Sequence, residues 1–312
     1  MGYSFAFPLE RSLLVNAKAW FLEVRPQFLL LSVVLAFLGT TVAWYEGFFN
    51  LGFALLAFLG ILLNHIAVNV LNDWHDNKSG IDRNTVRTPF SGGSGIIQAN
   101  LMTSRQVFWL GLVAFILSVP IGIYFIMVKG LILLPLLLVA GLCVLLYTPL
   151  LTRLGWPEWA PGVGLGLLPV LGAYFVQTGN YAAVAIVAAV PAGILVHNLL
   201  FLNEFPDESA DRKAGRKTLP ITIGKDASAW LYSALTVGVY LWIIGGVAMG
   251  KMPYPALLGL LTLPFAVKAI RGSFQHRDMS KLVPAQAANV MVVLLTQLLM
   301  GVGYILAGVF QI

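Results

Sequence analysis

The chain has 312 residues, of which 59% are hydrophobic and only 10% are Asp, Glu, Lys or Arg. Its mean hydropathy is +0.86. This composition excludes a soluble globular domain and predicts an all-α protein that crosses the lipid bilayer several times.

Apolar stretches long enough to cross about 30 Å of hydrocarbon predict nine transmembrane helices. In chain order they lie near residues 24–45, 48–71, 105–128, 130–150, 160–179, 181–203, 227–249, 254–271 and 286–310. We expect residues 1–312 to form a single membrane domain. Its two long polar loops, 72–104 and 203–226, follow the second and sixth predicted helices, so both lie on the same side of the membrane.

Positive charge is distributed unequally between the two faces. Of the 19 Lys and Arg residues, all but Lys129 and Lys251 lie at the N-terminus or in the loops after the second, fourth, sixth and eighth predicted helices. The positive-inside rule therefore places the N-terminus and both polar loops in the cytoplasm, with the protein in the cytoplasmic membrane. The net charge of +6 then reflects topology and attraction of anions, and it predicts neither a nucleic-acid partner nor an obligate protein partner.

Seven of the thirteen acidic residues fall in two segments that begin with Asn. Carboxylates at the ends of apolar membrane helices are costly and mark functional sites. In the first segment and the helix before it, the polar positions share one helical face, since their spacing is i, i+4, i+7, i+8 and i+11. These residues are His65, Asn69, Asn72, Asp73 and Asp76.

The second segment places Asn203, Asp207 and Asp211 at successive spacings of four, with Pro206 kinking or restarting the helix before Asp207. Like charges at this spacing destabilise a helix by about 0.2–0.5 kcal/mol, so the pair calls for a cation. Magnesium prefers oxygen ligands and is usually held by one or two carboxylates plus substrate phosphates. The sequence therefore predicts two magnesium half-sites, Asn72 with Asp76 and Asp207 with Asp211, that clamp a diphosphate.

Each polar loop also carries groups suited to an anion. In the first loop, glycines at 92, 93 and 95 allow backbone N–H groups to converge, and Arg87 precedes them. The second loop contains Arg212 and Lys217. The simpler interpretations remain open here: a Ser/Gly run is also a flexible turn, and basic loop residues also anchor topology.

These motifs resemble the two aspartate-rich motifs of the UbiA superfamily of intramembrane prenyltransferases, and the resemblance spans almost the whole chain. The first motif is Asn72-Asp73-x-x-Asp76 followed by Gly80-x-Asp82, and the second is Asn203-x-x-x-Asp207-x-x-x-Asp211-Arg212-x-Ala214-Gly215-x-x-Thr218-Leu219. Arg25-Pro26 at the start of the first helix, and Tyr147-Thr148-Pro149 with Arg153 after the fourth, are also similar to the family pattern. The resemblance implies nine helices in a bundle around a central cavity.

Within the superfamily, the pattern is most similar to the 1,4-dihydroxy-2-naphthoate prenyltransferases, which make menaquinone precursors. This similarity rests on Gly80-x-Asp82, on the form of the second motif and on Val176-Gln177-Thr178-Gly179. The chain departs from that branch at Glu204-Phe205-Pro206, where many members carry Asn, an apolar residue and Arg. Gly80 also replaces a third aspartate found in other branches, so Asp82 or water would take its place.

The resemblance implies Mg²⁺-dependent attack of a small aromatic acceptor on the allylic cation of a polyprenyl diphosphate, such as geranylgeranyl diphosphate. It implies catalytic roles for Asp76, Asp207, Asp211 and Tyr147, magnesium contacts for Asn72, Asp76, Asp207, Asp211 and the outer residue Asp82, and diphosphate contacts for Arg25, Arg87, Arg153, Arg212 and Lys217. The prenyl tail would lie in an apolar channel between helices.

Two alternatives remain at this point. A related enzyme would share the metal site but use a glyceryl phosphate ether, 4-hydroxybenzoate, haem or chlorophyll-type acceptor. A secondary transporter also keeps carboxylates in broken membrane helices, but near the bilayer midplane. The acids of this chain cluster at one surface, which favours the enzyme.

Overall fold

The computed structural model describes residues 17–81, 85 and 87–312. Within these residues, nine helical spans are long and apolar enough to cross a membrane. The predicted fold class and number of spans are therefore confirmed.

Six of the nine spans are single helices: α2 (Pro26–Tyr45), α3 (Leu51–Ser79), α4 (Ser104–Lys129), α9 (Ala183–Asn203), α12 (Lys225–Ala248) and α14 (Met279–Phe310). The other three are composite. They consist of η2 (Leu131–Leu133), α5 (Leu134–Leu146), η3 (Tyr147–Leu151) and α6 (Thr152–Leu154); of α7 (Trp159–Pro161), η4 (Gly162–Leu167) and α8 (Leu168–Thr178); and of η5 (Tyr254–Thr262) and α13 (Leu263–Ser273). Two short helices, α10 (Glu208–Lys213) and α11 (Leu219–Thr222), connect α9 to α12.

Helix α3 extends well beyond the apolar stretch that predicts it. It continues to Ser79 and ends at Gly80, whose φ of 76° is the left-handed conformation that glycine adopts without steric cost. Asn72 and Asp76 therefore project from the last two turns of a rigid helix, and the polar loop that begins at 72 in the sequence prediction begins after Ser79 in the structure.

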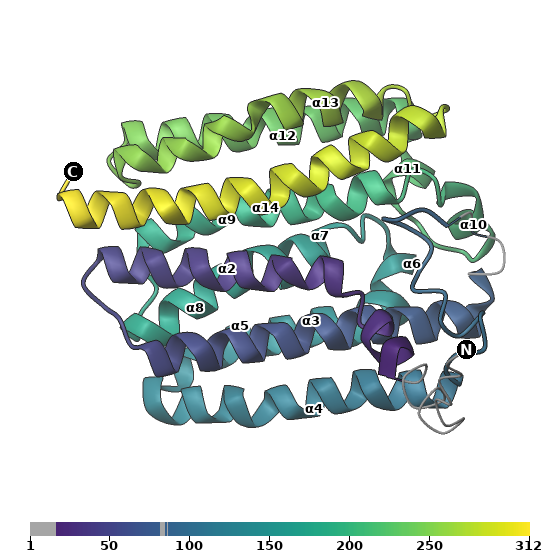
Figure 1. Ribbon diagram of the computed structural model, residues 1–312, viewed down its shortest axis with the longest axis horizontal. Coiled ribbons are helices and arrows are strands. Elements are labelled where there is room, and N and C mark those ends of the chain that lie inside the picture. Colours follow the sequence, from purple (N-terminus) through teal and green to yellow (C-terminus); the bar gives the residue numbers. More distant parts are fainter. Residues whose placement is uncertain (1–16, 82–84, 86) are drawn as a thin grey trace, which may run out of the picture.

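The spans lie side by side in a bundle, with α12 and α13 along one edge, α4 along the other, and α2 and α14 between them (Figure 1). Buried apolar side chains of α2, α9 and α14, among them Leu38, Leu195 and Val293, form the main core. Large apolar side chains on the outside, such as Met127 at 80% exposure, suit contact with lipid. The end of α3 and helices α10 and α11 lie at one end of the bundle, on the right in Figure 1, so both acidic motifs meet there.

Candidate active site

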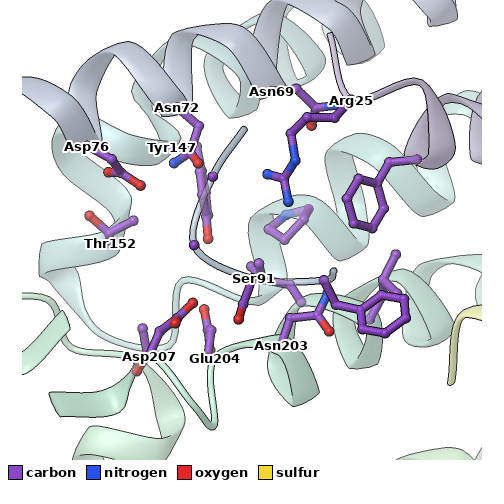
Figure 2. A pocket seen from close by; sticks show the side chains of 18 of the residues that line it. Arg25, Asn69, Asn72, Asp76, Ser91, Tyr147, Thr152, Asn203, Glu204 and Asp207 are labelled. Carbon is purple, nitrogen blue, oxygen red and sulfur yellow. The ribbon is translucent and has the colours of Figure 1, made fainter. Parts of the chain in front are cut away.

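A cavity of about 1050 Å³, including its open mouth, lies at the motif end of the bundle. Asn72, Asp76, Asp207 and Asp211 all line it. Figure 2 shows Asn72 and Asp76 on one wall and Asp207 on the opposite wall. The structure thus brings together the four residues that the sequence predicts as the inner metal ligands.

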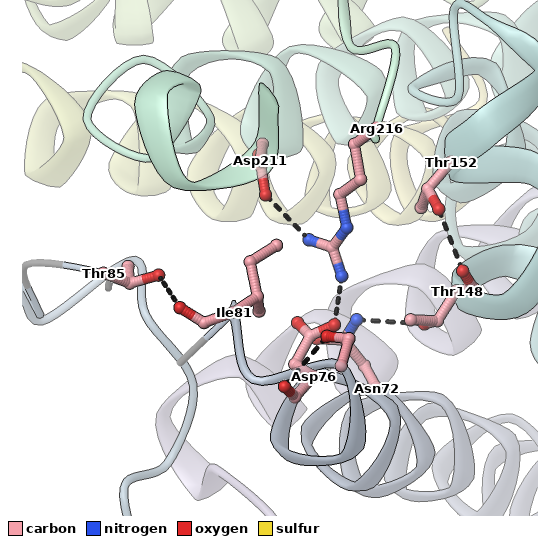
Figure 3. Close-up of polar contacts among 9 residues, drawn as sticks. Asn72, Asp76, Ile81, Thr85, Thr148, Thr152, Asp211 and Arg216 are labelled. Atoms are coloured by element: carbon pink, nitrogen blue, oxygen red, sulfur yellow. Dashed lines mark hydrogen bonds and ion pairs between the residues drawn. The ribbon is translucent and has the colours of Figure 1, made fainter. Parts of the chain in front are cut away.

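The first wall is held in place by η3 and α6. The side-chain amide of Asn72 donates to Thr148 Oγ1 at 3.0 Å, and Thr152 Oγ1 donates to the Thr148 carbonyl at 2.9 Å (Figure 3). Because the Nδ2 group of Asn72 is used in this contact, its carbonyl oxygen is the atom suited to ligate a cation. Tyr147, one residue before Thr148, lines the same cavity.

Asp73 has a structural role instead. One of its carboxylate oxygens accepts the Ser94 backbone N–H at 2.7 Å, and Glu23 accepts the Ser94 hydroxyl at 2.7 Å. These contacts hold the glycine-containing loop back against α3, so that Gly92 and Gly93 line the cavity. The predicted loop is therefore part of the site wall.

The second wall is formed by the turn between α9 and α10. Burial, together with the nearby charge of Asp211, raises the pKa of Asp207 to about 7. Burial likewise raises the pKa of Asp211. Asp207 Oδ1 is buried and has no hydrogen-bond partner. An unpaired buried carboxylate oxygen is costly, and a divalent cation would satisfy it.

Arg216 joins the two walls, a role that the sequence does not reveal. Its guanidinium forms ion pairs with Asp76 and, at 3.0 Å, with Asp211 (Figure 3). Burial acts to lower the pKa of Arg216, but the charges of Asp76 and Asp211 outweigh burial and raise it. A cation thus already sits between the two motifs.

A second pair of acids lies at and next to the cavity wall, and the sequence does not anticipate that these two residues pair. Glu204 lines the cavity, and Glu158 is fully buried in the turn before α7. Burial, followed by repulsion from Glu158, raises the pKa of Glu204 well above its usual range. Glu158 accepts the backbone N–H of Leu219 at 2.6 Å, which ties the α10–α11 loop to this turn.

The predicted diphosphate contacts are placed unequally. Arg25 lines the cavity, whereas Arg87, Arg153, Arg212 and Lys217 are not among its lining residues. Arg87 donates to Gly92 and Gln98 within its own loop, and Arg212 pairs with Glu208 at 2.6 Å. These roles stay predictions, as does that of Asp82, which lies outside the described residues.

The described oxygen donors of this site suit magnesium, although they do not form a complete cage of protein ligands. Within the described ranges, no three His, Cys, Asp or Glu side chains cluster closely enough to hold a metal by themselves. Magnesium rarely needs such a cage, because waters and substrate phosphates complete its coordination. Two features fit that mode of binding: the unpaired oxygen of Asp207, and the positive guanidinium of Arg216 that lies between Asp76 and Asp211.

Fold and site together define a multi-pass membrane enzyme with an acidic cavity at one end of its bundle. The chain belongs to the UbiA prenyltransferase family, whose family model matches residues 31–307. It is therefore a prenyltransferase, and the recognition from its motifs is confirmed.

Known relatives agree with this assignment. The chain is 28% identical over 278 residues to the 1,4-dihydroxy-2-naphthoate octaprenyltransferase of Bacillus subtilis, covering 85% of each protein. Its fold is similar to the apo structure of a UbiA homolog from Aeropyrum pernix K1, with a TM-score of 0.66, 18% identity and coverage of 90% of this chain and 98% of that one. It is also similar to a UbiA homolog from Archaeoglobus fulgidus bound to DMAPP and Mg²⁺, with a TM-score of 0.59, 13% identity and coverage of 88% and 98%.

Proposed function

We propose that this protein transfers a polyprenyl group from a prenyl diphosphate to 1,4-dihydroxy-2-naphthoate, in a Mg²⁺-dependent step of menaquinone biosynthesis. The observation that carries the proposal is the meeting of two sequence-distant acidic motifs on opposite walls of one cavity. The acceptor is supported by the likeness to the Bacillus subtilis enzyme. Support for the cation comes from the Archaeoglobus fulgidus homolog, which is bound to DMAPP and Mg²⁺.

In this proposal Asn72, Asp76, Asp207 and Asp211 hold the magnesium. When bound, it would neutralise charge that develops on the departing diphosphate. Arg25, whose guanidinium lies over the Phe28 ring at 4.6 Å, adds positive charge to the cavity lining. These groups stabilise the leaving group by position, since they are fixed before the substrate arrives.

Tyr147 and the apolar part of the cavity act on the other half of the donor. The Tyr147 ring lines the cavity together with Leu165, Val196 and Leu199. An aromatic face attracts a cation, and apolar walls keep water away from an allylic cation that water would quench. We assign to Tyr147 the stabilisation of the allylic carbon.

The prenyl tail has a matching compartment. A second cavity of about 690 Å³, almost wholly apolar in its lining, lies between α3, α4, α5 and α8. Leu165 lines both cavities. We infer that the donor's diphosphate lies in the acidic cavity while its tail passes Leu165 into the apolar one.

The spans make this a multi-pass membrane protein, and we infer an orientation with the acidic cavity on the cytoplasmic side. The described basic residues lie mainly at that end, whereas Lys129 ends α4 and Lys251 lies between α12 and η5, both at the other end. Reporter fusions placed after α3 and after α4 test this: the first should report the cytoplasm and the second the opposite side.

The enzymatic test uses the purified full chain with Mg²⁺, geranylgeranyl diphosphate and a panel of acceptors, followed by mass identification of products. The expected product is prenylated 1,4-dihydroxy-2-naphthoate or its decarboxylated form. Prenylation of 4-hydroxybenzoate or a glyceryl phosphate ether instead would replace the acceptor and keep the reaction class. Absence of any prenylated product, together with absence of Mg²⁺-dependent diphosphate release, would refute the proposal.

A further inference from the structure

Arg216 occupies the place where the two acidic motifs come closest. Its two terminal nitrogens contact different carboxylates, Asp76 on α3 and Asp211 on α10. All three side chains are largely buried, with exposed fractions of 16% for Arg216, 11% for Asp76 and 5% for Asp211. The pairing therefore joins two parts of the chain that lie far apart in the sequence, since Asp76 and Arg216 are separated by 140 positions.

The backbone around Arg216 is fixed from behind. Arg216 N donates to the Asp211 carbonyl at 3.0 Å, Lys217 N donates to the Thr152 carbonyl at 2.8 Å, and Trp156 N donates to the Lys217 carbonyl at 3.2 Å. Because these contacts hold the main chain, the long Arg216 side chain is the part of the loop that can change partners.

The atoms that Arg216 contacts are the atoms a divalent cation would need. An arginine side chain remains charged at any physiological pH, so it cannot vacate these oxygens by losing a proton. A metal ion must displace it. The displaced guanidinium then needs an anionic partner, and its planar fork matches phosphate oxygens well.

We propose that Arg216 is an exchangeable cation: it links Asp76 and Asp211 in the resting enzyme and transfers to the diphosphate when metal and diphosphate bind together. This inference rests on the proposed function. It predicts that metal and diphosphate bind cooperatively, because a metal ion alone displaces Arg216 without offering it a new partner. The same residue would thus keep the two walls aligned before the substrate arrives and bind the leaving group afterwards.

The test measures Mn²⁺ binding to the purified full chain in detergent micelles, by calorimetry or electron paramagnetic resonance, with and without inorganic pyrophosphate. In the wild type, pyrophosphate should tighten Mn²⁺ binding by a factor within the range of about 5 to 150 that is usual for coupled sites. In Arg216→Met, Mn²⁺ alone should bind more tightly than in the wild type, because no guanidinium competes. Pyrophosphate should then tighten Mn²⁺ binding by a smaller factor than in the wild type, because only direct contact between metal and phosphate remains.

Two further variants keep the test decisive. Arg216→Lys retains the charge, but a single ammonium cannot fork between two carboxylates in the same way; it should show the same two changes to a smaller degree, and it serves if Arg216→Met does not fold. Lys213→Met removes a charge from exposed surface of α10, away from the cavity lining, and should leave both quantities unchanged.

Wild-type affinity for Mn²⁺ and wild-type coupling in both Arg216 variants would overturn the exchange while leaving the metal site intact. Equal changes in Lys213→Met would overturn it as well, since they would show a general charge effect. No binding of Mn²⁺ to the wild type, with or without pyrophosphate, would remove the proposed function and the exchange together. Failure of the exchange alone is thus distinguishable from failure of the enzyme assignment.

Discussion

Replacing Glu158 separates the hydrogen-bonding role of its carboxyl group from its charge. The side chain is fully buried and accepts the Leu219 N–H at 2.6 Å. Glu158→Ala removes this acceptor and leaves the Leu219 N–H buried without a partner. Glu158→Gln keeps an oxygen acceptor of similar size and adds an amide that can donate to Glu204.

The expected magnitudes follow from those contacts. A hydrogen bond to a charged group contributes about 1.5–3 kcal/mol, and an unsatisfied buried donor costs about 1–3 kcal/mol. We therefore expect Glu158→Ala to lower the free energy of unfolding by about 1.5–3 kcal/mol. Glu158→Gln should stay within about 1 kcal/mol of the wild type, because it preserves the acceptor and relieves the repulsion between two buried acids.

The assay is denaturant unfolding in detergent micelles, followed by circular dichroism, with turnover measured in parallel. Glu158→Ala should also reduce turnover, because the loop that carries Arg216 loses one of its anchors to the turn before α7. Equal destabilisation by Gln and Ala would refute this reasoning, since it would show that the carboxylate charge, and not the acceptor atom, holds the loop.

Further predictions concern the metal, the tail and pH. Asp207→Asn and chelation of Mg²⁺ should each abolish turnover. The control Asp226→Asn changes an exposed acid outside the cavity and should retain turnover. An active Asp207→Asn variant would show that Asp207 is not a metal ligand. Leu165→Trp should shift donor preference towards shorter prenyl diphosphates, and an unchanged preference would place the tail elsewhere. Glu204→Gln should gain stability over the wild type as pH rises from about 5 to 8 in metal-free buffer. The reason is that folding raises the pKa of Glu204, so the folded wild-type protein loses stability as pH increases through that window. A difference in stability between variant and wild type that stays constant with pH would contradict this.

The sequence predicts the spans well because lipid leaves few alternatives. A chain crossing hydrocarbon must satisfy its backbone within helices, so apolar length alone finds the nine spans. It finds their ends less well. Helix α3 continues to Ser79 because helical hydrogen bonds do not stop where apolar side chains do, and only Gly80 ends it.

The pairing of Asn72 with Asp76 and of Asp207 with Asp211 was also predictable, because helical spacing places each pair on one face and topology places both motifs at one end of the bundle. Arg216 was not. In the sequence it is one of several basic residues in a short run, and the run itself does not say which of them points inward. That choice depends on contacts of the neighbouring Lys217 backbone with Thr152, at the end of another span, and with Trp156, in the turn after it.

Glu158 was missed for a similar reason. Its partner, the Leu219 amide, is a backbone group that carries no signal in the sequence. Glu204, by contrast, did carry one, since it is a departure from the motif pattern that the sequence resembles. Its burial beside a second acid gives that departure a physical meaning: the cavity wall holds a carboxyl group whose pKa is raised by burial and by repulsion from Glu158.

One part of the family resemblance supports the fold and not the chemistry. Gln177, in the segment that ends α8, lies at the end of the bundle opposite to the acidic cavity. Its side chain accepts the Asn50 N–H at 2.6 Å and donates to the Asn50 carbonyl at 3.0 Å, while its own carbonyl accepts from Lys129 at 2.9 Å. These contacts tie the turn before α3 to the ends of α4 and α8. Since α3 is a single helix from that turn to Gly80, holding its start also fixes the axial position of Asn72 and Asp76 at its other end.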